Sequence, residues 1–263
     1  MRVPGRLLIG LILALFSLLS YYGSSSINSG TSEAQRFNLS IEDEVAFGVQ
    51  AAPQVAEQFG GLSKDRDATA LVKKTGDNIV TQSSARKSPY QFAFHLLADP
   101  QTVNVFALPG GQIFITEGLF RLLRTPAELA GILGHAVGHV IGRHSAKRVT
   151  QQKLTLGLAD TAVATDPFQE KTQVAHLVAR LVVMRFDRKD ELEADSVGAR
   201  LMAEAGYDPR TLMGLIEVLN RASVSGRRSD FFRSHPNPEN RAARFQDELK
   251  RTFPTGVPVG LRQ

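Results

Sequence analysis

Residues 135 to 139 read His-Ala-Val-Gly-His and lie within a long apolar stretch. In a helix, side chains four residues apart share a face, so His135 and His139 would point toward one position. Glycines recur at nearly every turn around this pair: Gly131, Gly134, Gly138 and Gly142. A helix tolerates such glycines where other backbone must approach closely, as around a buried metal ion. The segment is therefore predicted to be a buried helix that presents two histidines to a metal.

The spacing of the pair matches the H-E-x-x-H pattern, in which two histidines hold zinc and the glutamate between them is the general base of a metalloprotease. Here the base position is occupied by Ala136. A methyl group cannot accept a proton, and general acid–base catalysis typically contributes about 10²- to 10⁴-fold to a rate. Metal binding need not fall, because position 136 supplies no ligand and alanine favours a helix. The expectation is a folded, zinc-loaded site that binds peptide and cleaves it poorly.

A zinc site of this kind needs a third protein ligand and an open fourth position. The chain has no cysteine, so disulfides and thiolate ligands are excluded. Glu191 and Asp195 are four apart on a predicted helix, so one can hold the metal while the other orients a histidine ligand. Glu193 falls on another face of that helix and is predicted to be solvated. Glu128 lies about two turns before the histidines, too far along the helix to replace the missing base.

The length, composition and charge of the chain limit the kinds of protein that it can be. The chain has 263 residues, 43% of them hydrophobic, which suffices for one sizeable core. Its net charge is +5 and its pI is about 9.6. The Lys and Arg residues are scattered and not interleaved with aromatic side chains, so we expect no nucleic-acid partner. A basic surface that favours anionic neighbours, such as lipid headgroups, is the simpler interpretation.

The N-terminal segment has the pattern of an export signal. Arg2 and Arg6 precede an apolar run over residues 7–22, which is shorter than a comfortable membrane span. Residues 1–22 are therefore predicted to be a cleaved signal peptide or an N-terminal membrane anchor, with the basic end on the cytoplasmic side. A Ser-rich flexible linker is expected to follow over residues 23–39.

The remaining periodicity predicts an α+β domain over residues 40–252, mainly helical with a small sheet, followed by a tail over residues 253–263. Two helices are expected first, then three strands, then a helical body. The predicted helices cover about 40–59, 67–82, 126–148, 150–163, 168–185, 188–205, 210–222 and 238–252. The predicted strands cover 91–97, 103–108 and 112–116, with a turn at 109–111.

Four stretches, in this order, carry a family resemblance. They are residues 104–111 (Asn-Val-Phe-Ala-Leu-Pro-Gly-Gly), residues 128–144 with the histidine pair, Glu191 to Asp195 with residues 205–209, and Ser234-His235-Pro236 with Arg241. In this respect the chain resembles the zinc metallopeptidases related to the CAAX prenyl protease and the heat-shock protease HtpX, of the gluzincin type. It is similar above all to the exported bacterial branch. The resemblance implies a zincin-like fold and one Zn²⁺ per chain.

The resemblance also implies roles for individual residues. His135, His139 and Glu191 would be the zinc ligands, and Asp195 would orient a ligand. His235 and Arg241 would lie near the metal as catalytic residues, either stabilising the oxyanion or covering the site in a resting state. A strand would pair through its edge with an extended polypeptide substrate. Its residues would be Gln112, Ile113, Phe114, Ile115 and Thr116.

Two functions remain open at this point. The first is a zinc metalloendopeptidase of the cell envelope that acts in protein quality control and whose base is missing at Ala136. The second is a pseudoprotease, a zinc-stabilised peptide-binding or chaperone-like module. Ala136 fits either a naturally inactive member or an inactivated form of an active protease. The leader and the resemblance place the protein beyond the bacterial inner membrane, in the periplasm or anchored facing it.

Overall fold

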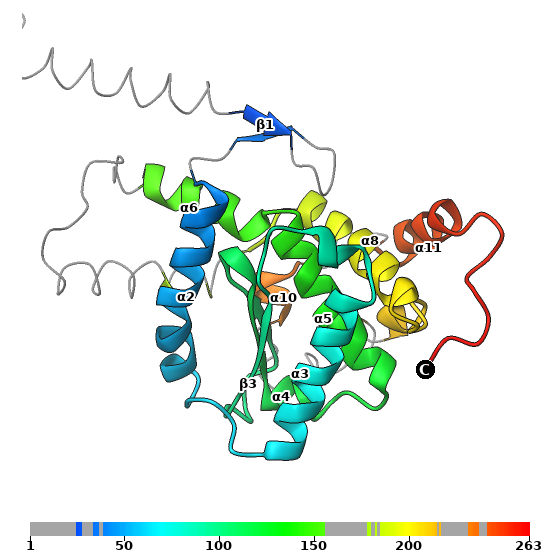
Figure 1. Cartoon of the computed structure of the whole chain (residues 1–263), viewed down its shortest axis with the longest axis horizontal. Helices are drawn as coiled ribbons and strands as arrows, with labels where there is room; N and C mark the ends of the chain where they lie inside the picture. Colours follow the sequence, from blue (N-terminus) through cyan, green and yellow to red (C-terminus); the bar gives the residue numbers. More distant parts are fainter. Residues whose placement is uncertain are drawn as a thin grey trace, which may run out of the picture.

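The computed structural model describes residues 39–155, 185–214, 231–236 and 241–263, together with 25–27, 34–36, 178, 179, 182 and 216. Helices enclose a small three-stranded sheet (Figure 1). The predicted mainly helical α+β fold is therefore confirmed. The predicted leader and helix 168–185 lie largely outside the described residues, as does most of helix 150–163. No helix within the described ranges is long and apolar enough to cross a membrane.

The first two helices form where the sequence predicts them. Helix α2 spans Ile41–Gln58 and begins with a capping box, in which the Ser40 hydroxyl accepts from the Asp43 N–H. Helix α3 spans Arg66–Thr81 and is capped by the Asp65 side chain. Within the segment predicted as a linker, strands β1 (Ser25–Ile27) and β2 (Ala34–Arg36) pair antiparallel.

The sheet contains β3 (Ala93–Leu97), β4 (Val105–Ala107) and β5 (Gln112–Thr116) in the order β3-β5-β4. Strand β5 pairs parallel with β3 and antiparallel with β4, so both of its edges are occupied. The prediction that residues 112–116 offer an edge to substrate is therefore wrong. A pattern of period two shows which face each residue occupies, but it does not show which strand lies in the middle.

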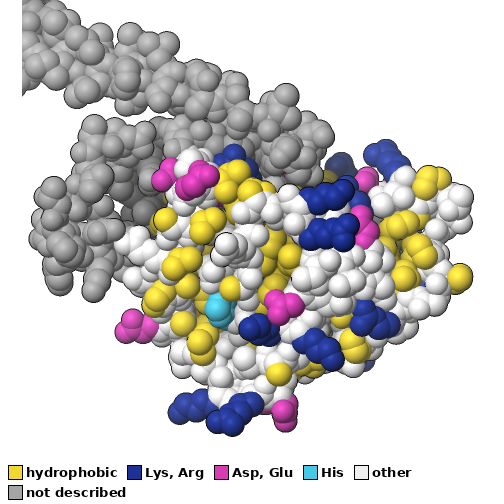
Figure 2. All heavy atoms as spheres, in the orientation of Figure 1, with side chains coloured by type: hydrophobic (Ala, Val, Ile, Leu, Met, Phe, Trp, Pro, Cys, Tyr) yellow, Lys and Arg dark blue, Asp and Glu magenta, His cyan; other side chains and the backbone are white. Residues whose placement is uncertain are grey.

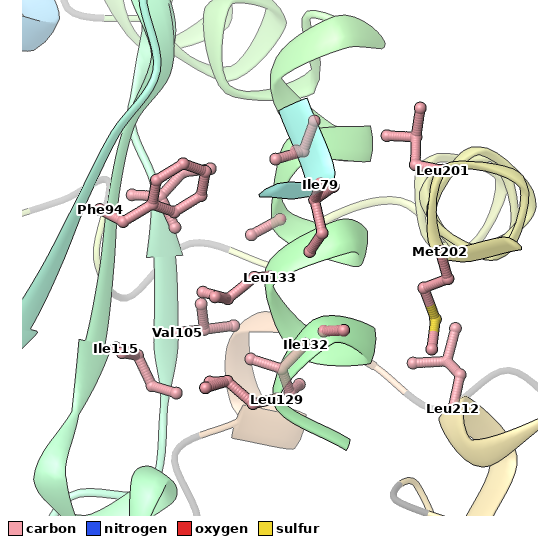
Figure 3. Close-up of a cluster of buried hydrophobic side chains, with 14 of the residues drawn as sticks. Ile79, Phe94, Val105, Ile115, Leu129, Ile132, Leu133, Leu201, Met202 and Leu212 are labelled. Carbon is pink, nitrogen blue, oxygen red and sulfur yellow. The ribbon is translucent and has the colours of Figure 1, made fainter. Parts of the chain in front are cut away.

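Each face of the sheet is covered by a separate apolar cluster. Helix α2 packs on one face, where Ala51 and Val55 meet Phe106 and Phe114. Helices α3 and α5 cover the opposite face (Figure 1). In Figure 3, Leu129 and Leu133 of α5 lie toward the sheet, and Met202 and Leu212 lie on the other side of α5, against Gly131. On the surface shown in Figure 2, Lys and Arg side chains are spread among acidic and apolar ones.

Helix α5, Pro126–Ile141, is the central element of the fold. Thr125 and Glu128 form a capping box at its start, and the helix is buried over almost its whole length between the sheet and α8 (Arg188–Glu204). Its glycines allow close contact with α8. A Cβ on Gly138 would lie 2.6 Å from the Ala194 carbonyl oxygen, and one on Gly198 would lie 2.9 Å from the His135 nitrogen. The glycine-rich pattern therefore reflects close helix packing.

The predicted helix 126–148 is two helices. Helix α5 ends at Ile141, and α6 begins at His144 and runs to Thr155. Between them, Gly142 is the C-terminal cap and Arg143 has φ 58°. This left-handed conformation is uncommon for a side chain other than glycine, and it turns the chain out of the helix. Apolar residues continue at helical spacing on both sides of this break, so the sequence pattern did not reveal where α5 ends.

The structure has further helices outside the sheet and the α5–α8 pair. Short helices α4 (Glu117–Phe120) and α10 (Phe231–Ser234) were not predicted, whereas α11 spans Arg241–Thr252 within the predicted range 238–252. In the predicted tail, Arg262 pairs with Tyr207 and its guanidinium stacks on the Tyr207 ring. The tail is therefore attached to the end of α8.

Candidate metal centre

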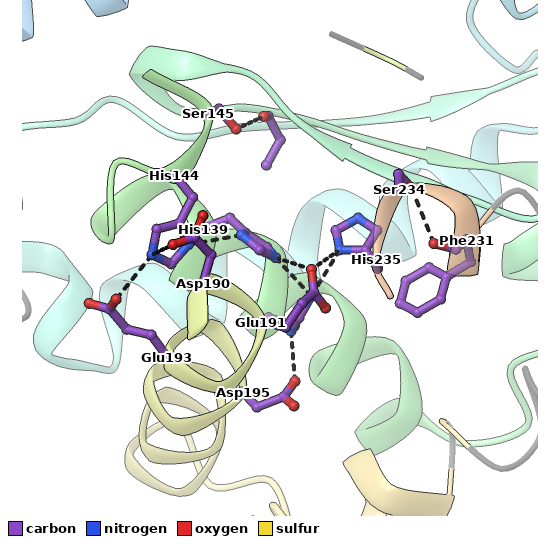
Figure 4. A network of polar contacts seen from close by, with 12 residues as sticks. His139, His144, Ser145, Asp190, Glu191, Glu193, Asp195, Phe231, Ser234 and His235 are labelled. Atoms are coloured by element: carbon purple, nitrogen blue, oxygen red, sulfur yellow. Dashed lines mark hydrogen bonds and ion pairs between the residues drawn. The ribbon is translucent and has the colours of Figure 1, made fainter. Parts of the chain in front are cut away.

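Four buried side chains from three parts of the chain converge beside α5. His135 and His139 come from α5, Glu191 from α8 and His235 from the end of α10 (Figure 4). One donor atom from each lies within 4.8 Å of all the others. The structure thus brings the three predicted ligands together, and it adds His235 as a fourth donor.

The spacing of the donor atoms suits a metal ion. His139 Nε2 lies 3.0 Å from His135 Nε2 and 3.5 Å from Glu191 Oε1, and His235 Nδ1 lies 3.3 Å from His135 Nε2. Tetrahedral zinc with bonds of about 2.0–2.1 Å separates neighbouring donors by about 3.3 Å. Glu191 Oε2 is also buried without a hydrogen-bond partner. The charge of that oxygen is met by the Arg241 guanidinium at 3.3 Å. Three imidazoles and one carboxylate at this spacing are a donor set that fits a metal such as zinc.

The electrostatics of the cluster favour ligand-competent side chains. Burial lowers the pKa of His139 well below its usual value and also lowers the pKa of His235. Burial raises the pKa of Glu191, but the nearby His235 and His139 outweigh that effect, and its pKa lies well below the usual range. Neutral imidazoles beside an ionised carboxylate are the states that bind a metal.

Asp195 and Arg241 support the cluster from behind. His135 Nδ1 lies 2.8 Å from Asp195 Oδ1, and Arg241 donates to both Asp195 oxygens at 2.6 and 2.7 Å. The guanidinium also lies 3.3 Å from Glu191 Oε2. Burial raises the pKa of Asp195, but Arg241 and His135 outweigh it and the net shift is downward. In this structure Arg241 is a partner of the two carboxylates, and its predicted role at an oxyanion stays a prediction.

His235 takes the place that the sequence left for water or substrate. Its Nδ1 lies 3.0 Å from Glu191 Oε1, and its ring stacks on Phe231 with centroids 4.7 Å apart. A ligand role for His235 was missed, because it lies 44 residues after Glu191 and no spacing rule links the two. Its position agrees with the alternative that His235 covers the site in a resting state.

Two other carboxylates near the motif, Glu128 and Glu193, are engaged with other groups. Glu128 caps the start of α5, and Glu193 Oε2 lies 3.1 Å from His144 Nε2. The prediction that Glu193 belongs to a solvated face is therefore wrong, because the break after α5 brings His144 against it. His144 in turn lies 2.9 Å from His139 through their Nδ1 atoms. Ala136 is itself buried, with 1% of its surface exposed.

The strand nearest the cluster is β4. A small cavity separates its edge from α6 and the metal centre, and the residues lining it include Val105, Ala107, Ser145, Ser234 and His235. The Ser145 hydroxyl donates to the Ala107 carbonyl. The neighbouring Leu108 N–H bonds to the Gln112 carbonyl, and alternate residues of a strand point to opposite edges, so the Ala107 carbonyl points away from β5. Figure 4 shows Ser145 near the cluster. Strand β4 therefore has an outer edge beside the metal centre, capped there by a side chain.

Several known proteins have amino-acid sequences similar to that of this chain. The chain is 28% identical over 223 residues to the mitochondrial metalloendopeptidase OMA1 of Schizosaccharomyces pombe, covering 83% of this chain and 65% of that protein. It is 26% identical over 229 residues to the beta-barrel assembly-enhancing protease of Escherichia coli, covering 83% and 46%. It is 25% identical over 232 residues to the metalloprotease YcaL of Escherichia coli, covering 85% and 87%.

This chain thus spans less than two thirds of the length of the first two relatives and most of the third. The match to the family as a whole covers residues 67–249, which contain the sheet, α5, α8 and all four donor residues of the cluster. The resemblance inferred from the motifs is confirmed, and the chain belongs to Peptidase family M48.

Proposed function

We propose that this protein is a zinc metalloendopeptidase of the cell envelope whose catalysis is strongly impaired by Ala136. The observation that carries the proposal is the buried cluster of three histidines and Glu191, whose donor atoms all lie within 4.8 Å of one another. His135, His139 and Glu191 would hold the ion, which would supply Lewis-acid polarisation of a scissile carbonyl. Ala136 stands where the base of the motif is expected, so proton transfer from the attacking water has no partner.

His235 keeps the resting site closed. Because its Nδ1 lies 3.3 Å from His135 Nε2 and 3.0 Å from Glu191 Oε1, it stands at the fourth donor position, which a catalytic zinc site keeps open for water or substrate. Access therefore requires His235 to move away. Its position at the end of α10, a helix of only four residues, makes such a movement local.

Loss of one histidine tests the metal site. His139→Ala removes a central donor and is expected to reduce bound zinc from about one ion per chain to almost none, since a closed zinc site needs its full ligand set. Metal analysis of purified protein after dialysis measures this. His95→Ala on β3 is the matched control, because its ring contacts Gln112 and Phe114 instead of the cluster. Unchanged zinc in His139→Ala would exclude the ligand assignment.

The substrate is proposed to be an extended polypeptide that pairs with the outer edge of β4. The Ser145 hydroxyl donates a hydrogen bond to the Ala107 carbonyl on that edge, so a substrate N–H must compete with this hydroxyl for the carbonyl. The basic and then apolar pattern of residues 1–22, predicted to be an export signal, supports a proposed location beyond the inner membrane, where misfolded or membrane-associated proteins are the proposed substrates.

Removal of the Ser145 hydroxyl tests whether a polypeptide binds at the outer edge of β4. Ser145→Ala is expected to tighten binding of fluorescein-labelled casein by about two- to tenfold, because a hydrogen bond contributes about 0.5–1.5 kcal/mol net. Fluorescence anisotropy measures it, and the slow turnover of the Ala136 chain keeps the peptide intact. Ser196→Ala is the control, because its hydroxyl bonds to Glu248 on α11. Equal affinity in both variants would argue against docking on β4.

The second candidate is a pseudoprotease that binds peptides without cleaving them. It is favoured by Ala136 alone, because every other element of the site is in place. Restoring the carboxylate distinguishes the two functions, as described in the Discussion.

A further inference from the structure

His139 has an unusual partner on its far nitrogen. Its Nδ1 lies 2.9 Å from Nδ1 of His144, and both side chains are fully buried. The other α5 ligand, His135, instead meets a carboxylate, that of Asp195, at 2.8 Å. The two histidines of the motif thus have different partners: an imidazole for His139 and a carboxylate for His135.

The pair can form a hydrogen bond in only one way once His139 binds a metal through Nε2. Its remaining proton then sits on Nδ1, so His139 donates and His144 Nδ1 accepts. A neutral His144 that accepts at Nδ1 carries its proton on Nε2. That atom lies 3.1 Å from Glu193 Oε2, a hydrogen-bond distance, and 4.0 Å from Asp190 Oδ1. In the hydrogen-bonded series Glu193–His144–His139, the proton positions are therefore fixed: one proton is on Nε2 of His144 and one is on Nδ1 of His139.

We propose that His144, fixed in one tautomer by Glu193, is a positioning residue that holds His139 in its metal-binding orientation. The inference rests on the metal site proposed above and assigns it a support that the two-histidine motif does not contain. A polar partner on the far nitrogen of a ligand histidine fixes its ring and typically changes metal affinity by about 10- to 100-fold.

The break between α5 and α6 creates this contact. In an uninterrupted helix, residue 144 would lie about 140° around the axis from residue 139 and would face away from it. Arg143 in its left-handed conformation turns the chain instead, and α6 starts with His144 beside His139. A Cβ on Gly142 would lie 2.5 Å from His144 Nε2, so any larger residue there would displace the imidazole.

The turn itself is anchored to the first helix. Arg143 Nε donates to Glu44 Oε1 at 2.7 Å, and Tyr90 donates to Glu44 Oε2 at 2.9 Å. A further Arg143 nitrogen donates to the Leu39 carbonyl. Glu44 is completely buried, so its two partners offset the cost of placing a carboxylate there. Helix α2 therefore holds the strained residue that places His144.

Two substitutions separate positioning from simple packing. His144→Leu fills the space but accepts no hydrogen bond. In His144→Asn, the carboxamide oxygen can occupy the place of Nδ1 and accept from His139. Competition with a chromophoric chelator measures zinc affinity in the otherwise unchanged protein. We expect zinc to bind about 10- to 100-fold more weakly in His144→Leu, and within about threefold of the parent in His144→Asn.

Two further variants complete the test. His95→Leu is the matched control and should keep the parent affinity. Glu193→Met, at a half-buried position, covers the case in which His144→Leu does not fold, and should weaken zinc binding severalfold because the tautomer is no longer fixed. Thermal unfolding without zinc shows which variants are folded.

The outcomes are distinct. If the parent binds zinc and folded His144→Leu, or Glu193→Met in its place, binds it equally well, the positioning role is wrong and the metal site stands. Equal losses in His144→Leu and His144→Asn would assign His144 to packing alone and also overturn the inference. A parent chain that binds no zinc would overturn the proposed function, and this inference with it.

Discussion

Replacing Ala136 with Glu is expected to raise the rate of peptide hydrolysis by about 10²- to 10⁴-fold, the usual contribution of a general base. Position 136 follows His135 directly on α5, so a carboxylate there starts from the helix that carries two of the metal donors. The new Glu accepts the proton of the attacking water and returns it to the leaving amine. Cleavage of labelled casein by zinc-loaded protein measures the change.

Ala136→Gln is the matched control for this experiment. Gln has nearly the volume of Glu, so both variants bear the same packing cost at a position that is 1% exposed, but an amide cannot act as a base. The Gln variant should stay at the parent rate. If zinc-loaded Ala136→Glu were as inert as Ala136→Gln, the enzyme hypothesis would lose its support and the peptide-binding alternative would gain it.

Replacing Arg241 with Leu is expected to lower the free energy of unfolding by about 3–5 kcal/mol, because it leaves buried carboxylates without their cation. Asp195 and Glu191 both contact this guanidinium, and all three side chains are at most 2% exposed. Denaturant unfolding in the presence of EDTA isolates this effect from metal binding. Zinc uptake should also weaken, because Asp195 orients His135.

Arg244→Leu provides the comparison on the same helix. Arg244 is exposed on α11, so its loss should change stability by no more than about 0.5 kcal/mol. An Arg241→Leu protein as stable as Arg244→Leu would mean that the buried ion pairs contribute little. The site would then be held mainly by the packing of α5 against α8.

Local patterns predicted the elements that carry the ligands. The four-residue spacing of His135 and His139, and of Glu191 and Asp195, acts within single helices, where periodicity alone sets the shared face. The ranges of α2 and α3 followed from the pattern of apolar positions, which is also a property of a single helix. The family followed from motif order, and the match over residues 67–249 confirms it.

Long-range partners escaped the same reasoning. His235 meets His135 across 100 residues, and Glu193 meets His144 across 49. Glu193 was misplaced for this reason, since its helix face was right but the element packed against it was unknown. The break at Arg143 also escaped, because a single left-handed residue leaves no trace in the apolar period.

The sequence by itself determined a buried helix with two metal-facing histidines, an acidic partner helix and the absence of the motif's base at Ala136. The tertiary structure alone decided that β5 lies in the middle of the sheet and that, among the described strands, β4 is at the edge beside the candidate metal centre. It also decided which side chain supports each ligand. The physical reason is that the spacing of apolar and polar residues shows only which face each residue occupies within a single helix or strand. Strand order and buried polar partners depend instead on how separate helices and strands pack together.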